Sequence, residues 1–84
     1  MLDQRHFDKL PFYEKIKKVY FEGEFVLSIR YYKFKINLFI YNNFYVEVFY
    51  NPKADKIDKI EIFKLPPSRV KFYADQIKLP SDLL

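Results

Sequence analysis

Glu47 is the residue of this sequence that is best placed for acid–base chemistry. It is the only charged residue between Lys35 and Lys53, within a run that is mostly aromatic and aliphatic. A carboxyl group held among aromatic rings can act as a general acid or base. Catalysis needs a second functional group, and the sequence places none beside it in a recognisable pattern. We therefore expect Glu47 on the less buried face of a strand, paired with Lys59, where its charge interrupts an aggregation-prone segment.

The other titratable residues form no catalytic or metal-binding pattern. His6 is the only histidine and the chain has no cysteine, which excludes the common zinc and thiolate sites. Asp55, Asp58 and Glu61 lie in and after a predicted turn, but their spacing differs from that of an EF-hand, whose glycine is also missing. We expect no catalytic residue, no metal and no cofactor, and we therefore expect that the protein is not an enzyme.

Basic and aromatic residues share one predicted face of a β-sheet. This face carries Arg30, Tyr32, Lys33, Lys35, Asn37, Phe39, Tyr41, Tyr45 and Phe49. Cations for phosphates and rings for bases are what single-stranded nucleic acid requires. However, Glu47 lies on the same face, the net charge is only +4, and the order of elements is not that of an RNA-recognition domain. Single-stranded nucleic acid is therefore the alternative partner.

The favoured expectation is a contact with protein. Contiguous apolar patches usually mark protein interfaces, and two short helices cover a sheet only partly. The candidate interaction face consists of Tyr32, Lys35, Phe39, Tyr41, Tyr45 and Phe49. It predicts a small binding module that forms a homodimer or binds another protein. If the helices cover both faces instead, the chain is a monomer whose role the sequence does not show.

Length and composition indicate one domain spanning residues 1–84. The chain has ten Phe and eight Tyr, and these large rings compensate for the small size of the core. The N-terminal segment carries acids and lacks the apolar run of a signal peptide. The longest uncharged run is well short of the about 20 residues of a membrane-spanning helix. We expect a soluble, cytoplasmic protein with no membrane partner.

Helical spacing changes to strand spacing at Gly23. Apolar residues recur at helical intervals from Pro11 to Glu22, which predicts a helix. Gly23 is expected to end it in the left-handed conformation. The period then becomes two, which predicts strands at 25–32, 34–41, 44–50 and 57–63 in an antiparallel meander. Within the first strand, one face is expected to carry Phe25, Leu27, Ile29 and Tyr31.

The second hairpin leaves a choice of register. A two-residue turn at Asn42–Asn43 pairs Leu38 with Glu47 and mixes apolar with charged positions. A three-residue loop pairs Leu38 with Val48 and keeps one apolar face, so burial favours the longer loop.

Charge selects a register for the third hairpin. Pairing Tyr50 with Lys56 sets Glu47 opposite Lys59, whereas a shift of two residues sets it opposite Glu61. Like charges directly opposite are destabilising, so we favour the first register.

The segment Leu38–Asn51, LFIYNNFYVEVFYN, resembles a strand pattern of short bacterial proteins of unknown function. In that pattern an aromatic residue is followed by Tyr or Phe, Val, Glu, Val or Leu, any residue, Tyr, and Asn or Asp. The similarity extends from about Gly23 to the C-terminus, although this sequence has Asn in the turn where Gly or Asp is usual. The resemblance implies a bacterial protein, but no activity, cofactor or catalytic residue.

The C-terminal part predicts one more helix. The prolines of Leu65–Ser68 end the sheet, and Ser68 is expected to cap a short helix that runs to about Gln76. Leu83 and Leu84 are expected to fold back as an apolar tail. The whole pattern predicts an α+β domain with an N-terminal helix, a four-stranded antiparallel β-meander and a short C-terminal helix.

Overall fold

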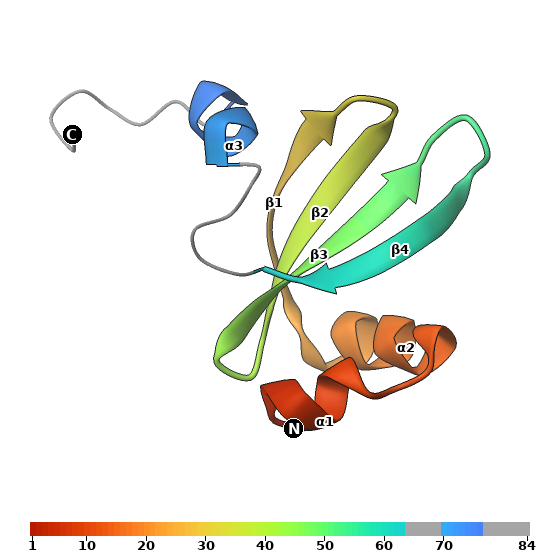
Figure 1. Cartoon of the computed structure of the whole chain (residues 1–84), viewed down its shortest axis with the longest axis vertical. Coiled ribbons are helices and arrows are strands. Elements are labelled where there is room, and N and C mark those ends of the chain that lie inside the picture. Colours follow the sequence, from red (N-terminus) through yellow and green to blue (C-terminus); the bar gives the residue numbers. More distant parts are fainter. Residues whose placement is uncertain (64–69, 77–84) are drawn as a thin grey trace, which may run out of the picture.

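The computed structural model describes residues 1–63 and 70–76 and confirms the α+β architecture. The elements are α1 (Gln4–Asp8), α2 (Phe12–Glu22), β1 (Glu24–Tyr31), β2 (Phe34–Tyr41), β3 (Phe44–Asn51), β4 (Lys56–Ile62) and α3 (Val70–Gln76). The strands pair antiparallel in the order β1-β2-β3-β4, as expected for a meander (Figure 1). The expected cap at Ser68 and the apolar tail at Leu83–Leu84 lie outside the described residues.

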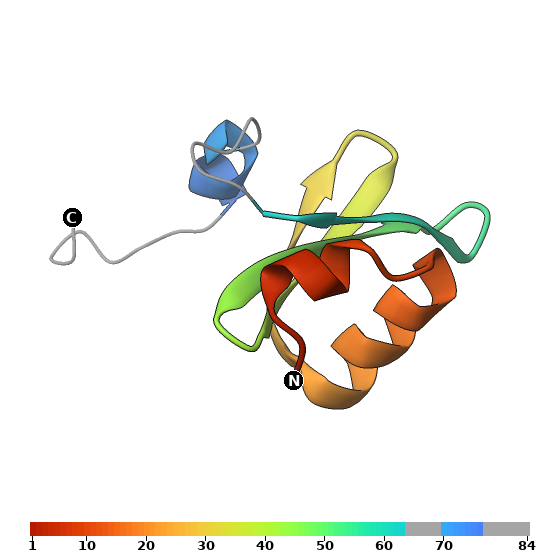
Figure 2. The same ribbon diagram turned by 60° about the horizontal axis from the view of Figure 1, so that its bottom comes forward.

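Helices lie against both faces of the sheet (Figure 2). We call the face covered by α1 and α2 the α2 face, and the face that packs against α3 the α3 face. The core of the α2 face consists of Phe7, Val19, Phe39, Tyr41, Phe44, Val46, Val48, Ile60 and Ile62. The core of the α3 face consists of Ile29, Ile36, Leu38, Phe49 and Tyr73. In the central strands β2 and β3, the side chains that point to either face of the sheet are thus buried. This explains the nearly continuous apolar sequence of these strands.

Helix α1 was not indicated by the sequence pattern. The carboxylate of Asp3 caps it by accepting a hydrogen bond from the backbone N–H of His6 at 2.9 Å. Phe7 is fully buried, and its ring lies 5.2 Å from that of Tyr41 and 5.6 Å from that of Phe44. The N-terminal segment is therefore part of the core.

Gly23 ends α2 in a different way from the one expected. Its backbone is extended, with φ −85° and ψ 171°, so the expected left-handed conformation is wrong. The reason for glycine is space. A Cβ atom would lie 2.6 Å from the carbonyl oxygen of Val19 and 3.2 Å from that of Ile40. Gly23 allows the chain to pass closely against the backbones of α2 and β2.

A bulge in β1 changes the face on which the strand begins. Phe25 pairs with Phe39, but Leu27 pairs with Leu38, so Val26 is an extra residue. Phe25 therefore lies on the α2 face, where its ring is 5.8 Å from that of Phe39. The expectation that Phe25 and Leu27 share a face is wrong.

The turn between β2 and β3 has two residues, so the longer loop favoured from burial is wrong. Leu38 pairs with Glu47. Asn42 adopts φ 58°, in the left-handed region that asparagine tolerates better than most residues. Burial favours the longer loop only if Glu47 is exposed, whereas Glu47 is itself buried beside the apolar residues.

The register between β3 and β4 also differs from the expected one. Glu47 lies opposite Glu61 rather than opposite Lys59. Each carboxylate has its own partner. The hydroxyl of Tyr73 donates to Oε2 of Glu47 at 2.9 Å, and Nζ of Lys59 lies 3.3 Å from Oε1 of Glu61. These partners offset the repulsion between like charges on which the sequence argument relied.

Candidate functional site

The residues of the candidate interaction face do not lie together in the structure. Phe39 and Tyr41 are buried on the α2 face, Phe49 is buried on the α3 face, and Tyr32, Lys35 and Tyr45 are exposed. The two-residue turn is the cause, because it shifts the faces of β2 relative to those of β3. The expected single aromatic outer face is therefore corrected: its buried members belong to the protein's own cores.

Glu47 joins α3 to the sheet. It is fully buried, not partly exposed, and it accepts the hydrogen bond from Tyr73. Lys59, its expected partner, instead pairs with Glu61 and lies 4.5 Å from the centroid of the Phe49 ring. The contacts of Glu47 are those of a residue that holds two elements together.

His6 and two exposed acids, Asp3 and Asp55, contact residues close to them in the sequence. Nδ1 of His6 lies 2.8 Å from Oδ1 of Asp3, and the hydrogen bonds from the His6 backbone and side chain lower the pKa of Asp3. The hydroxyl of Tyr50 donates to Asp55, which raises the pKa of Tyr50. Within residues 1–63 and 70–76, no group of His, Asp and Glu is gathered closely enough to hold a metal ion.

Large apolar side chains are exposed where α2 ends and β1 begins. We call this group, Tyr20, Phe21, Phe25 and Val26, the apolar patch; its exposed fractions are 47%, 85%, 58% and 43%. The rings of Tyr20 and Phe25 lie 4.9 Å and 5.8 Å from the ring of Phe39. These two rings thus continue the core of the α2 face outwards, and Phe21 and Val26 directly follow them in the sequence.

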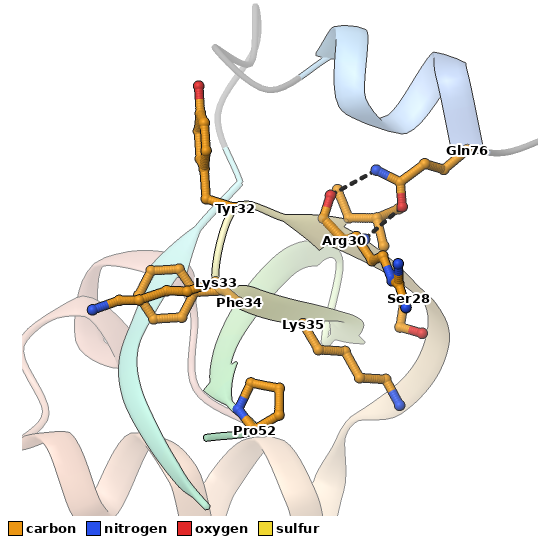
Figure 3. A pocket seen from close by; sticks show the side chains of 9 residues that line it. Ser28, Arg30, Tyr32, Lys33, Phe34, Lys35, Pro52 and Gln76 are labelled. Carbon is orange, nitrogen blue, oxygen red and sulfur yellow. Dashed lines mark hydrogen bonds between the residues drawn. The ribbon is translucent and has the colours of Figure 1, made fainter. Parts of the chain in front are cut away.

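A second surface surrounds the turn at the other end of β1 (Figure 3). Here a hollow of about 670 Å³ is lined by residues that include Arg30, Tyr32, Lys33, Lys35, Pro52 and Gln76. We call it the basic hollow, because the described residues that line it include three cations, Arg30, Lys33 and Lys35, and no acid. In the part of the chain that the structure describes, none of these cations forms an ion pair with a carboxylate.

Gln76 forms the wall of this hollow at the outer edge of β1. Its amide oxygen accepts a hydrogen bond from the backbone N–H of Arg30 at 2.5 Å, and its amide nitrogen donates to the carbonyl oxygen of Arg30 at 2.6 Å (Figure 3). The side chain thus takes the place of a neighbouring strand and covers part of a sheet edge. Sequence reasoning missed this contact, since the two residues are 46 positions apart and no pattern links them.

Comparisons with protein families, with curated proteins and with solved structures found no match to this chain. Among residues 1–63 and 70–76, no helix has the length and apolar character needed to cross a membrane. The apolar patch and the basic hollow are the two surfaces of the described residues that suit a binding partner.

Proposed function

We propose that the protein is a small interaction module without catalytic activity that self-associates through the apolar patch. The observation that carries this proposal is the exposure of two phenylalanines, 85% for Phe21 and 58% for Phe25, within one short segment. Removing apolar surface from water is favourable by about 25 cal/mol per Å². A partner that covers these rings is therefore stabilised by burial, and the patch replaces the sheet face as the proposed interface.

The charges around the patch favour a second copy of the chain as the partner. Lys17 and Lys18 lie in the second half of α2 and pair with Glu14 and Glu22 of the same helix at 3.7 Å and 3.2 Å, and Glu24 begins β1. In a two-fold dimer the same patch is present on both sides, so the bases of one copy can face the acids of the other. A rim that carries both positive and negative charges suits such self-complementary contact.

The lack of cysteine suits the reducing cytoplasm, which is the compartment we propose.

Sedimentation velocity over a range of protein concentrations tests self-association. The unmodified protein is expected to shift from monomer to dimer as concentration rises, and Phe21→Asp is expected to remain monomeric. Tyr13→Asp is the matched control, because Tyr13 is 75% exposed on the same helix but lies outside the patch. A protein that stays monomeric at high micromolar concentration, or equal effects of the two substitutions, would contradict the proposal.

A further inference from the structure

We propose that the basic hollow binds single-stranded nucleic acid, with Arg30 and Lys35 holding phosphates and Tyr32 stacking on a base. The hollow is a different surface from the apolar patch: it surrounds the turn between β1 and β2 and combines cations with an exposed ring.

Arg30 and Lys35 are directly opposite each other on neighbouring strands. Like charges in this position destabilise a sheet, and within residues 1–63 and 70–76 no acidic side chain lines the hollow to compensate them. Figure 3 shows both side chains on the same side of the hairpin. An anion placed between them is attracted to both and relieves their repulsion. A phosphate group suits this position, because both side chains donate charged hydrogen bonds.

Lys33 extends the cationic surface around the turn. Its Nζ lies 5.3 Å from the centroid of the Phe34 ring, and Figure 3 shows the side chain pointing to the opposite side from Lys35. A ligand that crosses the turn therefore meets cations on both sides of it. A chain of linked phosphates fits this distribution better than a single small anion.

Tyr32 is exposed, and its backbone has a conformation that is unfavourable for a tyrosine. It adopts φ 54° in the left-handed region, where a bulky residue is an outlier. The following hairpin has Asn42 at the corresponding position with φ 58°. The Tyr32 side chain is nevertheless 81% exposed, while its ring is supported by those of Tyr31 and Phe72, at 4.8 Å and 5.5 Å.

A ring that is both supported and exposed can stack on a base. Such stacking requires an unpaired base, because the bases of a duplex already stack on one another. The combination of cations with this ring therefore favours a single strand over a duplex or a polyanion without bases.

Fluorescence anisotropy with a labelled oligothymidylate of about 10 nucleotides tests the proposal. Binding is expected at low salt, and the logarithm of the association constant should fall against the logarithm of salt concentration with a slope of about −1.4 to −2.1, for two or three phosphate contacts. Absence of binding at low salt would overturn the proposal.

A pair of matched double variants tests the location of the site. Arg30→Ala with Lys35→Ala is expected to weaken binding about tenfold or more, and the backbone of Arg30 remains available to Gln76. Arg5→Ala with Lys9→Ala removes the same two residue types from exposed positions at α1 and is expected to leave binding unchanged. Equal losses in both would show that only net charge matters and would overturn the site.

Two substitutions of Tyr32 test the chemical class of the ligand. Tyr32→Asn removes the ring while suiting the backbone conformation, and it is expected to weaken binding about tenfold. Tyr32→Phe keeps the ring and is expected to retain affinity. Inorganic polyphosphate, which has no bases, is expected to compete poorly at equal phosphate concentration. Full affinity in Tyr32→Asn, or effective competition by polyphosphate, would identify a general polyanion site instead. Phe21→Asp, which tests self-association, is expected to leave binding of this short strand unchanged.

Discussion

Glycine is required at position 23 because there is no room for a Cβ atom. A Cβ there would lie 2.6 Å from the carbonyl oxygen of Val19 and 3.2 Å from that of Ile40, so these contacts are relieved only if α2 or β2 shifts. Gly23→Ala is therefore expected to lower the free energy of unfolding by about 1–3 kcal/mol. Urea denaturation measures this, with Ser28→Ala on exposed β1 as the control. Equal midpoints for the two variants would show that the close approach does not constrain the fold.

The buried hydrogen bond between Tyr73 and Glu47 can be tested by removing one oxygen atom. Tyr73→Phe keeps the ring but deletes the hydroxyl that donates to the carboxylate at 2.9 Å. Hydrogen bonds to charged groups contribute about 1.5–3 kcal/mol, and a loss of that size is expected in urea denaturation. Tyr13→Phe, on an exposed ring, is expected to have no effect. If the two substitutions cost the same, the bond does not hold α3 to the sheet.

The contact between Tyr50 and Asp55 is expected to make the stability of the fold depend on pH in the alkaline range. The hydroxyl donates to Oδ1 at 2.5 Å, and this hydrogen bond to an anion raises the pKa of Tyr50. A raised pKa in the folded state means that the contact stabilises the fold below the unfolded pKa of about 10, and that this stabilisation is lost as pH rises through the folded pKa.

Asp55→Asn is expected to lower the pKa of Tyr50 towards its usual value, because phenolate formation no longer brings two negative charges together. Titration of the Tyr50 ring carbon by NMR measures the change. Identical titration curves for the variant and the unmodified protein would show that the carboxylate is not the cause.

At the scale of elements, periodicity predicted the strands because alternation is a local property of each segment. It did not predict how the faces of neighbouring strands combine, since this depends on the number of residues in each turn. Tyr32 and Lys35 belong to one hairpin, and both line the basic hollow. A three-residue turn between β2 and β3 would place Phe39 and Phe49 on the same face. The turn has two residues, so the two rings lie on opposite faces of the sheet.

The short helices α1 and α3 depend on contacts with distant residues, and sequence patterns therefore indicate little of their roles. Helix α1 has only five residues and is stabilised through the packing of Phe7 on the sheet. Glu47 has a partner 26 positions later in α3. An isolated charge in an apolar strand indicated a special environment, but nothing in its neighbourhood identified Tyr73.

The edge of β1 gives a prediction at this scale. Gln76 pairs with both backbone groups of Arg30, so Gln76→Ala should expose this part of the edge. The loss of about 1 kcal/mol for a hydrogen bond corresponds to an increase of about fivefold in amide exchange. Hydrogen exchange measured by NMR at the Arg30 amide should show this increase, while the amides of β3 stay protected. Unchanged exchange at Arg30 would mean that the edge is not held by Gln76.

At the scale of the whole molecule, the two proposed surfaces lie at opposite ends of β1. The apolar patch includes Phe25 at its beginning, and the basic hollow includes Tyr32, just beyond its end. At about 3.3 Å per residue, these positions are about 23 Å apart along the strand. A second copy of the chain on the patch therefore leaves the hollow accessible, and both surfaces can be occupied in the same particle.

A dimer would carry two basic hollows, so a strand long enough to reach both should bind with avidity. Phe21→Asp is expected to weaken binding of such a long oligothymidylate by about tenfold or more and to leave binding of the short one unchanged. Fluorescence anisotropy with both lengths measures this, and Tyr13→Asp should behave as the unmodified protein. Weaker binding of the short strand as well would contradict the separation of the two surfaces. Unchanged binding of the long strand would mean that self-association does not bring two hollows onto one strand.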